Sequence, residues 1–226
     1  MSDITLTGAG RGSYGGGGGG GGGEVTYTVS ASLDDGHFKR LTGSNTFPST
    51  FSSVHKTAST AQTVKSYDDD GATYDYRKAY FRFQNINIAQ GTTIQSAFFK
   101  PIFKSGNTAS VTMHIVGTDL DNVPAPSAAS PDGDTSRHTS AIVDWVNPYD
   151  PPTSTDTSRQ TSPDIKTIIQ EIVDRSGWSA GNAIMIQSYF DHSMFSGHAS
   201  RLARAWDDTS SGASQGDYAA QLVITT

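Results

Sequence analysis

The chain has 226 residues with 16 basic and 22 acidic side chains, which gives a net charge of −6. This acidic balance argues against broad nucleic-acid binding, because no surplus of Lys and Arg is available to neutralise phosphates. The sequence has no Cys, so disulfides, thiolate catalysis and zinc–thiolate sites are excluded. No apolar run approaches the roughly 18 residues needed to span a bilayer. Neither a nucleic-acid partner nor a membrane is therefore expected.

The first residues lack the basic segment and the apolar stretch of a secretory signal peptide. The charged fraction is low, at 17%, and Ser and Thr are abundant. A hydroxyl-rich β protein made without an export signal is typical of virion proteins, which assemble in the cytoplasm and leave it by lysis. Localisation to a virion is therefore expected.

A run of nine glycines follows Tyr14. Because glycine loses the most backbone entropy on ordering, such a run does not hold a fixed shape by itself. It is either a flexible linker of up to about 30 Å or an arm threaded across a neighbouring subunit. In the second interpretation residues 1–24 form an assembly arm. Its glycines are Gly15, Gly16, Gly17, Gly18, Gly19, Gly20, Gly21, Gly22 and Gly23.

Alternating apolar and polar residues predict most of the secondary structure as strands. The expected strands cover residues 25–33, 79–83, 93–103, 110–118, 140–146, 183–190, 202–206 and 218–225. Pro101 indicates that its strand lies at an edge or contains a bulge. Residues 34–76 are rich in Ser, Thr and Asp, and are expected to form an irregular connection with one or two short strands.

One amphipathic helix is predicted at about 162–176. Ser162 suits the N-cap, Pro163 the first helical position, and Asp164 the positive end of the helix dipole. Gly177 is placed to cap the C-terminus. The apolar stripe, spaced for a helix that packs on a sheet, comprises Ile165, Ile168, Ile169, Ile172 and Val173.

Eight to ten short strands with a single helix predict an all-β fold, a two-sheet β-sandwich of the jelly-roll type. The chain is divided into a Gly-rich anchoring arm (1–24), a strand with an irregular connecting region (25–78) and the jelly-roll sandwich (79–226).

Catalytic motifs are not found in the sequence: it has no Gly-x-Ser-x-Gly elbow, His-Glu-x-x-His, phosphate loop or dinucleotide fingerprint. Its six His are dispersed, and Glu occurs only at positions 24 and 171. A non-enzymatic protein without a catalytic cofactor is expected. A polysaccharide-acting enzyme stays open as a minor alternative, since the spacing of its carboxylates would be spatial.

Two weaker site hypotheses concern oxygen ligands and aromatic rings. Asp119, Asp121 and Asn122 follow a strand and could hold a structural calcium ion, or could simply form an Asx-rich turn. Trp145, Trp206 and Tyr189 could stack on a glycan, or could pack in a sandwich core.

Several segments resemble one known family. These are residues 79–83, the connection from Ile88 through Gly91 and Ile94 to Ala97, residues 116–122, the long stretch from Pro163 to Ala183, and 219–223. Together they resemble the DNRLRE-type and carbohydrate-binding-module-like jelly rolls of bacterial surface proteins, over about two-thirds of the chain. The resemblance implies a sandwich used for adhesion, display or spacing, although the family's usual export signal is missing.

The expected function is that of a bacteriophage virion structural protein, most simply a capsid decoration or fibre-like protein. It would be a homo-oligomer anchored by its arm to other virion subunits. The alternative is a carbohydrate-binding or adhesion module of a bacterial surface or secreted protein.

Overall fold

The computed structural model describes residues 23–44, 46–56, 60–67, 73–106, 111–127, 133–146, 157–190 and 198–226. These residues form 12 β-strands and one α-helix, with short 3₁₀ helices at Thr135–Arg137 and Ser210–Gly212. All strand pairs are antiparallel. The expected all-β sandwich with one helix is therefore confirmed.

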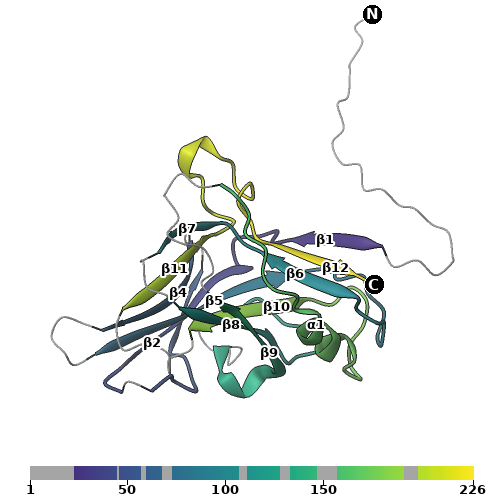
Figure 1. Ribbon diagram of the computed structural model, residues 1–226, viewed down its shortest axis with the longest axis horizontal. Coiled ribbons are helices and arrows are strands. Elements are labelled where there is room, and N and C mark those ends of the chain that lie inside the picture. Colours follow the sequence, from purple (N-terminus) through teal and green to yellow (C-terminus); the bar gives the residue numbers. More distant parts are fainter. Residues whose placement is uncertain are drawn as a thin grey trace, which may run out of the picture.

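The strands form a small sheet and a large one (Figure 1). The small sheet has the order β1 (Glu24–Thr28), β12 (Gln221–Thr225), β6 (Ser96–Lys100). The large sheet runs β7 (Phe103–Gly106), β11 (Ala199–Arg204), β4 (Thr60–Tyr67), β5 (Tyr74–Phe83), β10 (Ile184–Phe190), β8 (Thr112–Thr118), β9 (His138–Val146). On the other edge of β5 lies β2 (Asp35–Thr42), which also pairs with β3 (Ser53–Lys56).

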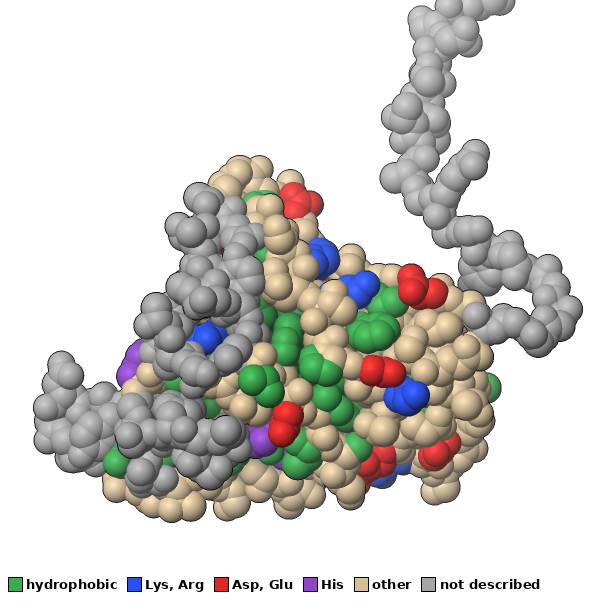
Figure 2. Space-filling model, in the orientation of Figure 1, with side chains coloured by type: hydrophobic (Ala, Val, Ile, Leu, Met, Phe, Trp, Pro, Cys, Tyr) green, Lys and Arg blue, Asp and Glu red, His purple; other side chains and the backbone are tan. Residues whose placement is uncertain are grey.

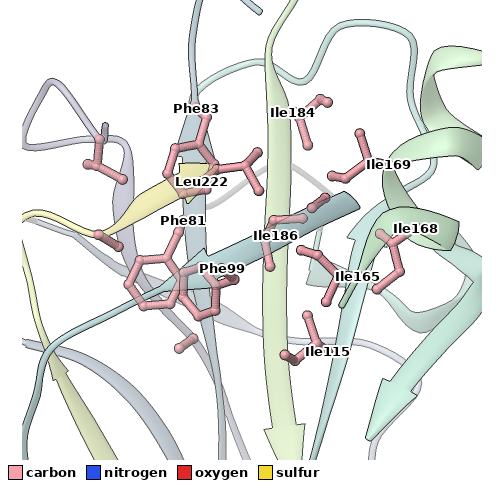
Figure 3. Close-up of a cluster of buried hydrophobic side chains, with 14 of the residues drawn as sticks. Phe81, Phe83, Phe99, Ile115, Ile165, Ile168, Ile169, Ile184, Ile186 and Leu222 are labelled. Carbon is pink, nitrogen blue, oxygen red and sulfur yellow. The ribbon is translucent and has the colours of Figure 1, made fainter. Parts of the chain in front are cut away.

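The main core lies between the two sheets. Phe81 of β5 meets Phe99 of β6, with ring centroids 4.8 Å apart, and Leu222 of β12 belongs to the same cluster (Figure 3). Isoleucines of β8 and β10 extend this cluster to the helix (Figure 3). Burial of this much apolar surface is the main force that holds the sheets together.

A second, smaller apolar cluster covers the opposite face of the large sheet. Phe38, Tyr80 and Met185 of β2, β5 and β10 are buried there under Val123, with Phe51 packed against them. Because strand residues alternate between faces, even-numbered residues of β5 point to this cluster, whereas Ala79 and Phe81 point to the main core. The middle of the large sheet is thus covered on both faces.

The helix α1 spans Lys166–Val173, shorter than expected, and packs against β9, β8 and β6. Its predicted apolar stripe is confirmed, since all five side chains are buried. Ser162 is not the N-cap: its Oγ accepts a hydrogen bond from the Phe99 amide of β6, at 3.0 Å. Instead, Asp164 Oδ1 accepts hydrogen bonds from the amides of Lys166 and Ala97. The segment before the helix therefore covers the free edge of β6.

The chain passes from the small sheet to the large one at Pro101. One long strand was expected over 93–103, but the structure has β6 in the small sheet and β7 in the large sheet. Pro101 lacks an amide hydrogen, so it ends the pairing of β6, and its carbonyl accepts the amide of Gln160. The proline thus forms a corner of the sandwich.

The prediction that residues 34–76 are mostly irregular is wrong. The structure places β2, β3 and β4 there, and β5 begins at Tyr74, so a domain boundary at residue 79 would fall inside β5. These strands carry Lys, Arg, His, Ser and Thr, so the apolar alternation that marks a half-buried strand is weak. Their stability comes from pairing, since all eight residues of β2 pair with β5.

In the ranges that the structure describes, no helix combines the length and apolarity needed to cross a membrane. On the face shown in Figure 2, acidic and basic side chains are interspersed with hydrophobic and other uncharged groups, and neither sign of charge forms a large patch among the residues described.

Candidate functional site

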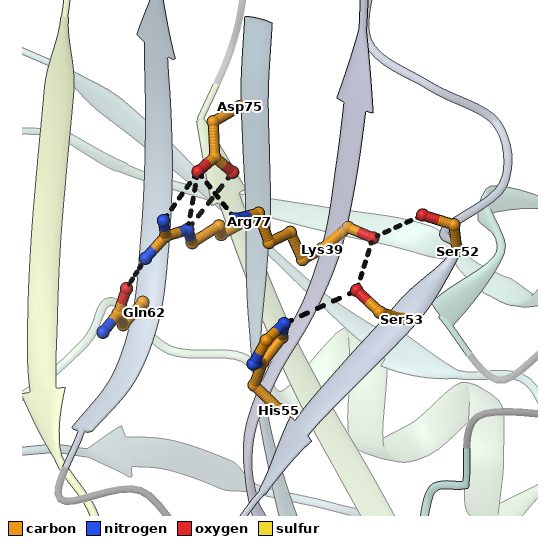
Figure 4. A network of polar contacts seen from close by, with 7 residues as sticks. All are labelled: Lys39, Ser52, Ser53, His55, Gln62, Asp75 and Arg77. Carbon is orange, nitrogen blue, oxygen red and sulfur yellow. Dashed lines mark hydrogen bonds and ion pairs between the residues drawn. The ribbon is translucent and has the colours of Figure 1, made fainter.

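A group of polar side chains gathers on one face of the large sheet, where β2, β3, β4 and β5 run side by side (Figure 4). The register explains the grouping, because Arg77 lies opposite Lys39, and Lys39 lies opposite Ser53. Directly opposed residues point to the same face of a sheet. We call this group the β2–β5 polar cluster; its members are Lys39, Ser53, His55, Gln62, Asp75 and Arg77.

The cluster continues the face that forms the main core. Along β5 the residues on this face change from Phe83, Phe81 and Ala79, which are buried in the core, to Arg77 and Asp75. Leu41 of β2, opposite Asp75, is 52% exposed. The face therefore changes from core to half-buried polar surface within one strand.

Asp75 is the centre of the cluster. Its carboxylate accepts hydrogen bonds from Arg77 Nε and Nη2, the latter at 2.6 Å, and lies 3.3 Å from Lys39 Nζ. Burial by itself would raise the pKa of Asp75, but Arg77 and Lys39 outweigh burial and hold this pKa below its ordinary value. Asp75 is therefore ionised at neutral pH. Two cations share this one carboxylate.

Arg77 is held in one orientation by two neighbours. One side of its guanidinium binds Asp75, and Nη1 donates to Gln62 Oε1 of β4. Gln62 in turn donates from Nε2 to Thr60 Oγ1, at 3.1 Å. Planar donors and acceptors fixed in this way are preorganised to hydrogen-bond a polar ligand.

His55 of the cluster forms a stacked pair with His37, which lies beside the cluster. The rings of His37 and His55 lie 4.8 Å apart with an interplanar angle of 7°. Burial, followed by the neighbouring His55 and Arg77, lowers the pKa of His37 to about 3, and burial and Lys39 lower the pKa of His55. Both rings are therefore neutral at pH 7. The Nδ1 atom of His37 is buried and has no hydrogen-bond partner among the described residues.

A second polar group lies on the opposite face of β5 but is sealed from solvent. Lys78 is completely buried, with Nζ 2.5 Å from the Gly133 carbonyl and 2.6 Å from His138 Nε2. Burial lowers the pKa of Lys78 well below its ordinary value, and burial together with Lys78 lowers that of His138 to about 3. The ring of Phe51 lies 4.9 Å from the amine. This buried pair supports the second core and is not placed to meet a ligand.

The three residues predicted to hold calcium lie together, but with protein partners. Arg175 Nε donates to Asp121 Oδ1 at 2.7 Å, and Arg175 Nη1 pairs with Asp119. The Asn122 side chain accepts the amide of Ala183 at 2.9 Å. Calcium would have to replace Arg175 on both carboxylates, and the calcium site stays a prediction. In the part of the chain that the structure describes, no three His, Asp or Glu side chains are grouped to hold a metal ion.

The three aromatic residues predicted to stack on a glycan are not brought together. Trp145 is 8% exposed and packs in the main core against Phe103. Tyr189 and Trp145 lie on different faces of the large sheet. Trp145 pairs across the strands with Met113, which belongs to the main core, whereas Tyr189 pairs with His114, which points to the other face. Trp206 packs at the border of the main core, and its amide donates to Asp35. These residues form no common platform in the structure.

The β2–β5 polar cluster was missed in the sequence, and only a weak signal could have indicated it. Its residues come from four strands spread over Lys39 to Arg77, and no pair has a motif spacing. The observable signal was the alternation of Asp75 and Arg77 with Tyr74 and Tyr76 in β5. Of the predicted assembly arm, Gly15 to Gly22 lie outside the described residues, and Gly23 directly precedes β1.

Neither a scan against protein-family models nor a search of curated proteins finds a match for this chain.

Proposed function

We propose that the protein is a non-enzymatic structural protein of a bacteriophage virion, a capsid decoration or fibre-like subunit that displays its sandwich from an N-terminal anchor. The proposal is supported mainly by the position of β1. This strand directly follows the glycine run and pairs with β12 at the edge of the small sheet. Four of its five residues are exposed, and Val25 is 46% exposed.

An exposed edge strand is a natural place for contact with another subunit. Its free amides and carbonyls can pair with a neighbouring strand, and many such weak contacts repeated by symmetry add up to strong attachment. Among the described strands, β1 has no partner on the edge that faces away from β12. A segment entering at this edge would leave the rest of the sandwich displayed.

Light scattering on the full chain, and on a variant that begins at Gly23, tests this proposal. We expect the full chain to form an oligomer, and the shortened chain to be a monomer with an unchanged unfolding midpoint. A control chain with Ser at positions 16, 18, 20 and 22 separates two roles of the glycines. A tether would tolerate these serines, whereas a closely packed arm would not. A full chain that is monomeric at every concentration would contradict self-assembly.

The alternative, a carbohydrate-binding module, is not supported by the predicted aromatic residues, since Trp145 is buried and the three residues are separated. A glycan would need a different site.

A further inference from the structure

The β2–β5 polar cluster has the composition of a binding site for a negatively charged ligand. It has two cationic groups, Lys39 and Arg77, and one carboxylate, Asp75, while the neighbouring histidines are neutral at pH 7. The cluster therefore carries a net charge of about +1 on a protein whose overall charge is −6. A local cation on an acidic protein favours a small anionic group over a polyanion such as nucleic acid.

Lys39 is the residue with the most capacity for another partner. Its ammonium has three N–H donors, and its contact with Asp75 is long for a hydrogen bond, at 3.3 Å. The side chain is 24% exposed. By contrast, the Arg77 guanidinium is engaged by Asp75 and Gln62. Lys39 can thus bind an anion while Arg77 keeps the surrounding groups in place.

The rest of the cluster suits a ring that carries hydroxyl groups. Asp75 and Gln62 offer fixed polar atoms, and Ser53 adds a hydroxyl. The exposed His55 ring and the exposed Leu41 side chain offer apolar contact on the same face. A pyranose ring carries hydroxyl groups beside C–H surfaces, so it can make both kinds of contact. The buried Nδ1 of His37, which lacks a partner among the described residues, is a further polar atom beside the cluster.

We propose that the β2–β5 polar cluster binds a saccharide that carries a carboxylate, with Lys39 pairing with that carboxylate. This site is separate from the edge of β1, so it does not depend on the assembly role proposed above.

Calorimetric titration of the full chain with a galacturonic-acid tetrasaccharide and with the neutral galactose tetrasaccharide tests the proposal. We expect the acidic sugar to bind at least about tenfold more tightly, the value of one charge-assisted hydrogen bond. Lys39→Gln should remove this preference and Lys39→Arg should retain it. Lys166→Gln, which alters an exposed lysine on α1, should leave the binding unchanged.

Unfolding midpoints of all variants establish that they are folded, and Lys39→Arg supplies the test should Lys39→Gln fail to fold. Three results would overturn the proposal: no binding of the acidic sugar, equal binding of the two sugars, or full binding by Lys39→Gln. Inorganic phosphate is added as a competitor. Displacement of the sugar by an equal concentration of phosphate would overturn the saccharide assignment and indicate a simple anion site.

Discussion

Gly36→Ala is expected to destabilise the protein by about 3 to 5 kcal/mol, in the range of the most damaging single substitutions. Gly36 lies in β2 with a φ of +154°, between β3 and β5. A Cβ atom there would overlap the carbonyl oxygen of His55 and lie 2.9 Å from the Tyr80 hydroxyl. The backbone of β3 would have to move, which would break the pairing that also positions His55 beside the cluster.

Urea unfolding of Gly36→Ala and of the control Gly91→Ala measures this effect. Gly91 also has a positive φ, of +71°, but its added Cβ would meet nothing within 4 Å. Gly91→Ala should therefore show only the cost of the backbone conformation, about 1 kcal/mol. Equal losses of unfolding free energy in the two variants would contradict the close approach of β2 and β3.

Asp35→Asn is expected to stabilise the protein by about 2 to 4 kcal/mol at pH 7.5. Asp35 is 1% exposed; Oδ2 accepts the amide of Trp206 at 2.8 Å, and Oδ1 has no partner among the described residues. Burial, with a smaller contribution from Asp207 and Asp34, raises the pKa of Asp35 to about 8. The folded protein thus keeps a proton that the unfolded chain loses near its ordinary pKa of 3.8.

The pH dependence gives the sign of this effect. Between about pH 4 and pH 8 the folded state binds more protons at Asp35 than the unfolded state does, so this residue makes stability fall as the pH rises. Asparagine is neutral at every pH and removes this loss. The stability difference between Asp35→Asn and the unchanged protein should therefore be small near pH 4 and increase up to about pH 8. Subtracting the stability of the unchanged protein cancels the contributions of His37, His138 and Lys78, which both proteins share. The lowered pKa values of these groups make stability rise with pH, opposite to the effect of Asp35.

The neighbouring carboxylate provides the control for Asp35→Asn. Asp34 is equally buried but accepts hydrogen bonds from Arg82 Nη1 and Gln84 Nε2, both at 2.6 Å. Asp34→Asn places an amide N–H₂ against one of these donors and leaves a buried cation unpaired, so it should destabilise the protein. Chemical unfolding at several pH values measures both variants. A difference for Asp35→Asn that does not change with pH, or a loss at pH 7.5, would contradict the raised pKa.

Prediction from the sequence succeeded for the helix, because burial of one helical face determines the spacing of its apolar residues. The stripe from Ile165 to Val173 has the helical period because each of its five apolar side chains enters the main core. The predicted start of the helix was wrong because the Ser162 side chain makes a different hydrogen bond. Its hydroxyl accepts the Phe99 amide, so the edge of β6 competes with helix capping for the same oxygen.

The polar strands could not be predicted because their signal is not local. Lys39, His55 and Arg77 come together through the register of β2 with β3 and β5. Lys39 and His55 lie in segments without apolar alternation. Pairing over eight residues between β2 and β5 determines these strands, and it is a contact between distant parts of the chain. The candidate site could not be predicted for the same reason, whereas local patterns predicted a calcium ligand at Asp119 and a glycan contact at Trp145.

The most direct test of the proposed anchoring is tryptic cleavage after Arg11, followed by intact mass spectrometry. Arg11 is the first basic residue of the chain, and the next is Lys39, within β2. We expect slow cleavage at Arg11 while the full chain is assembled and fast cleavage once dilution dissociates it, with the fragment from Gly12 remaining folded. Rapid removal of residues 1–11 from an assembly that stays intact would contradict anchoring by this part of the N-terminal segment.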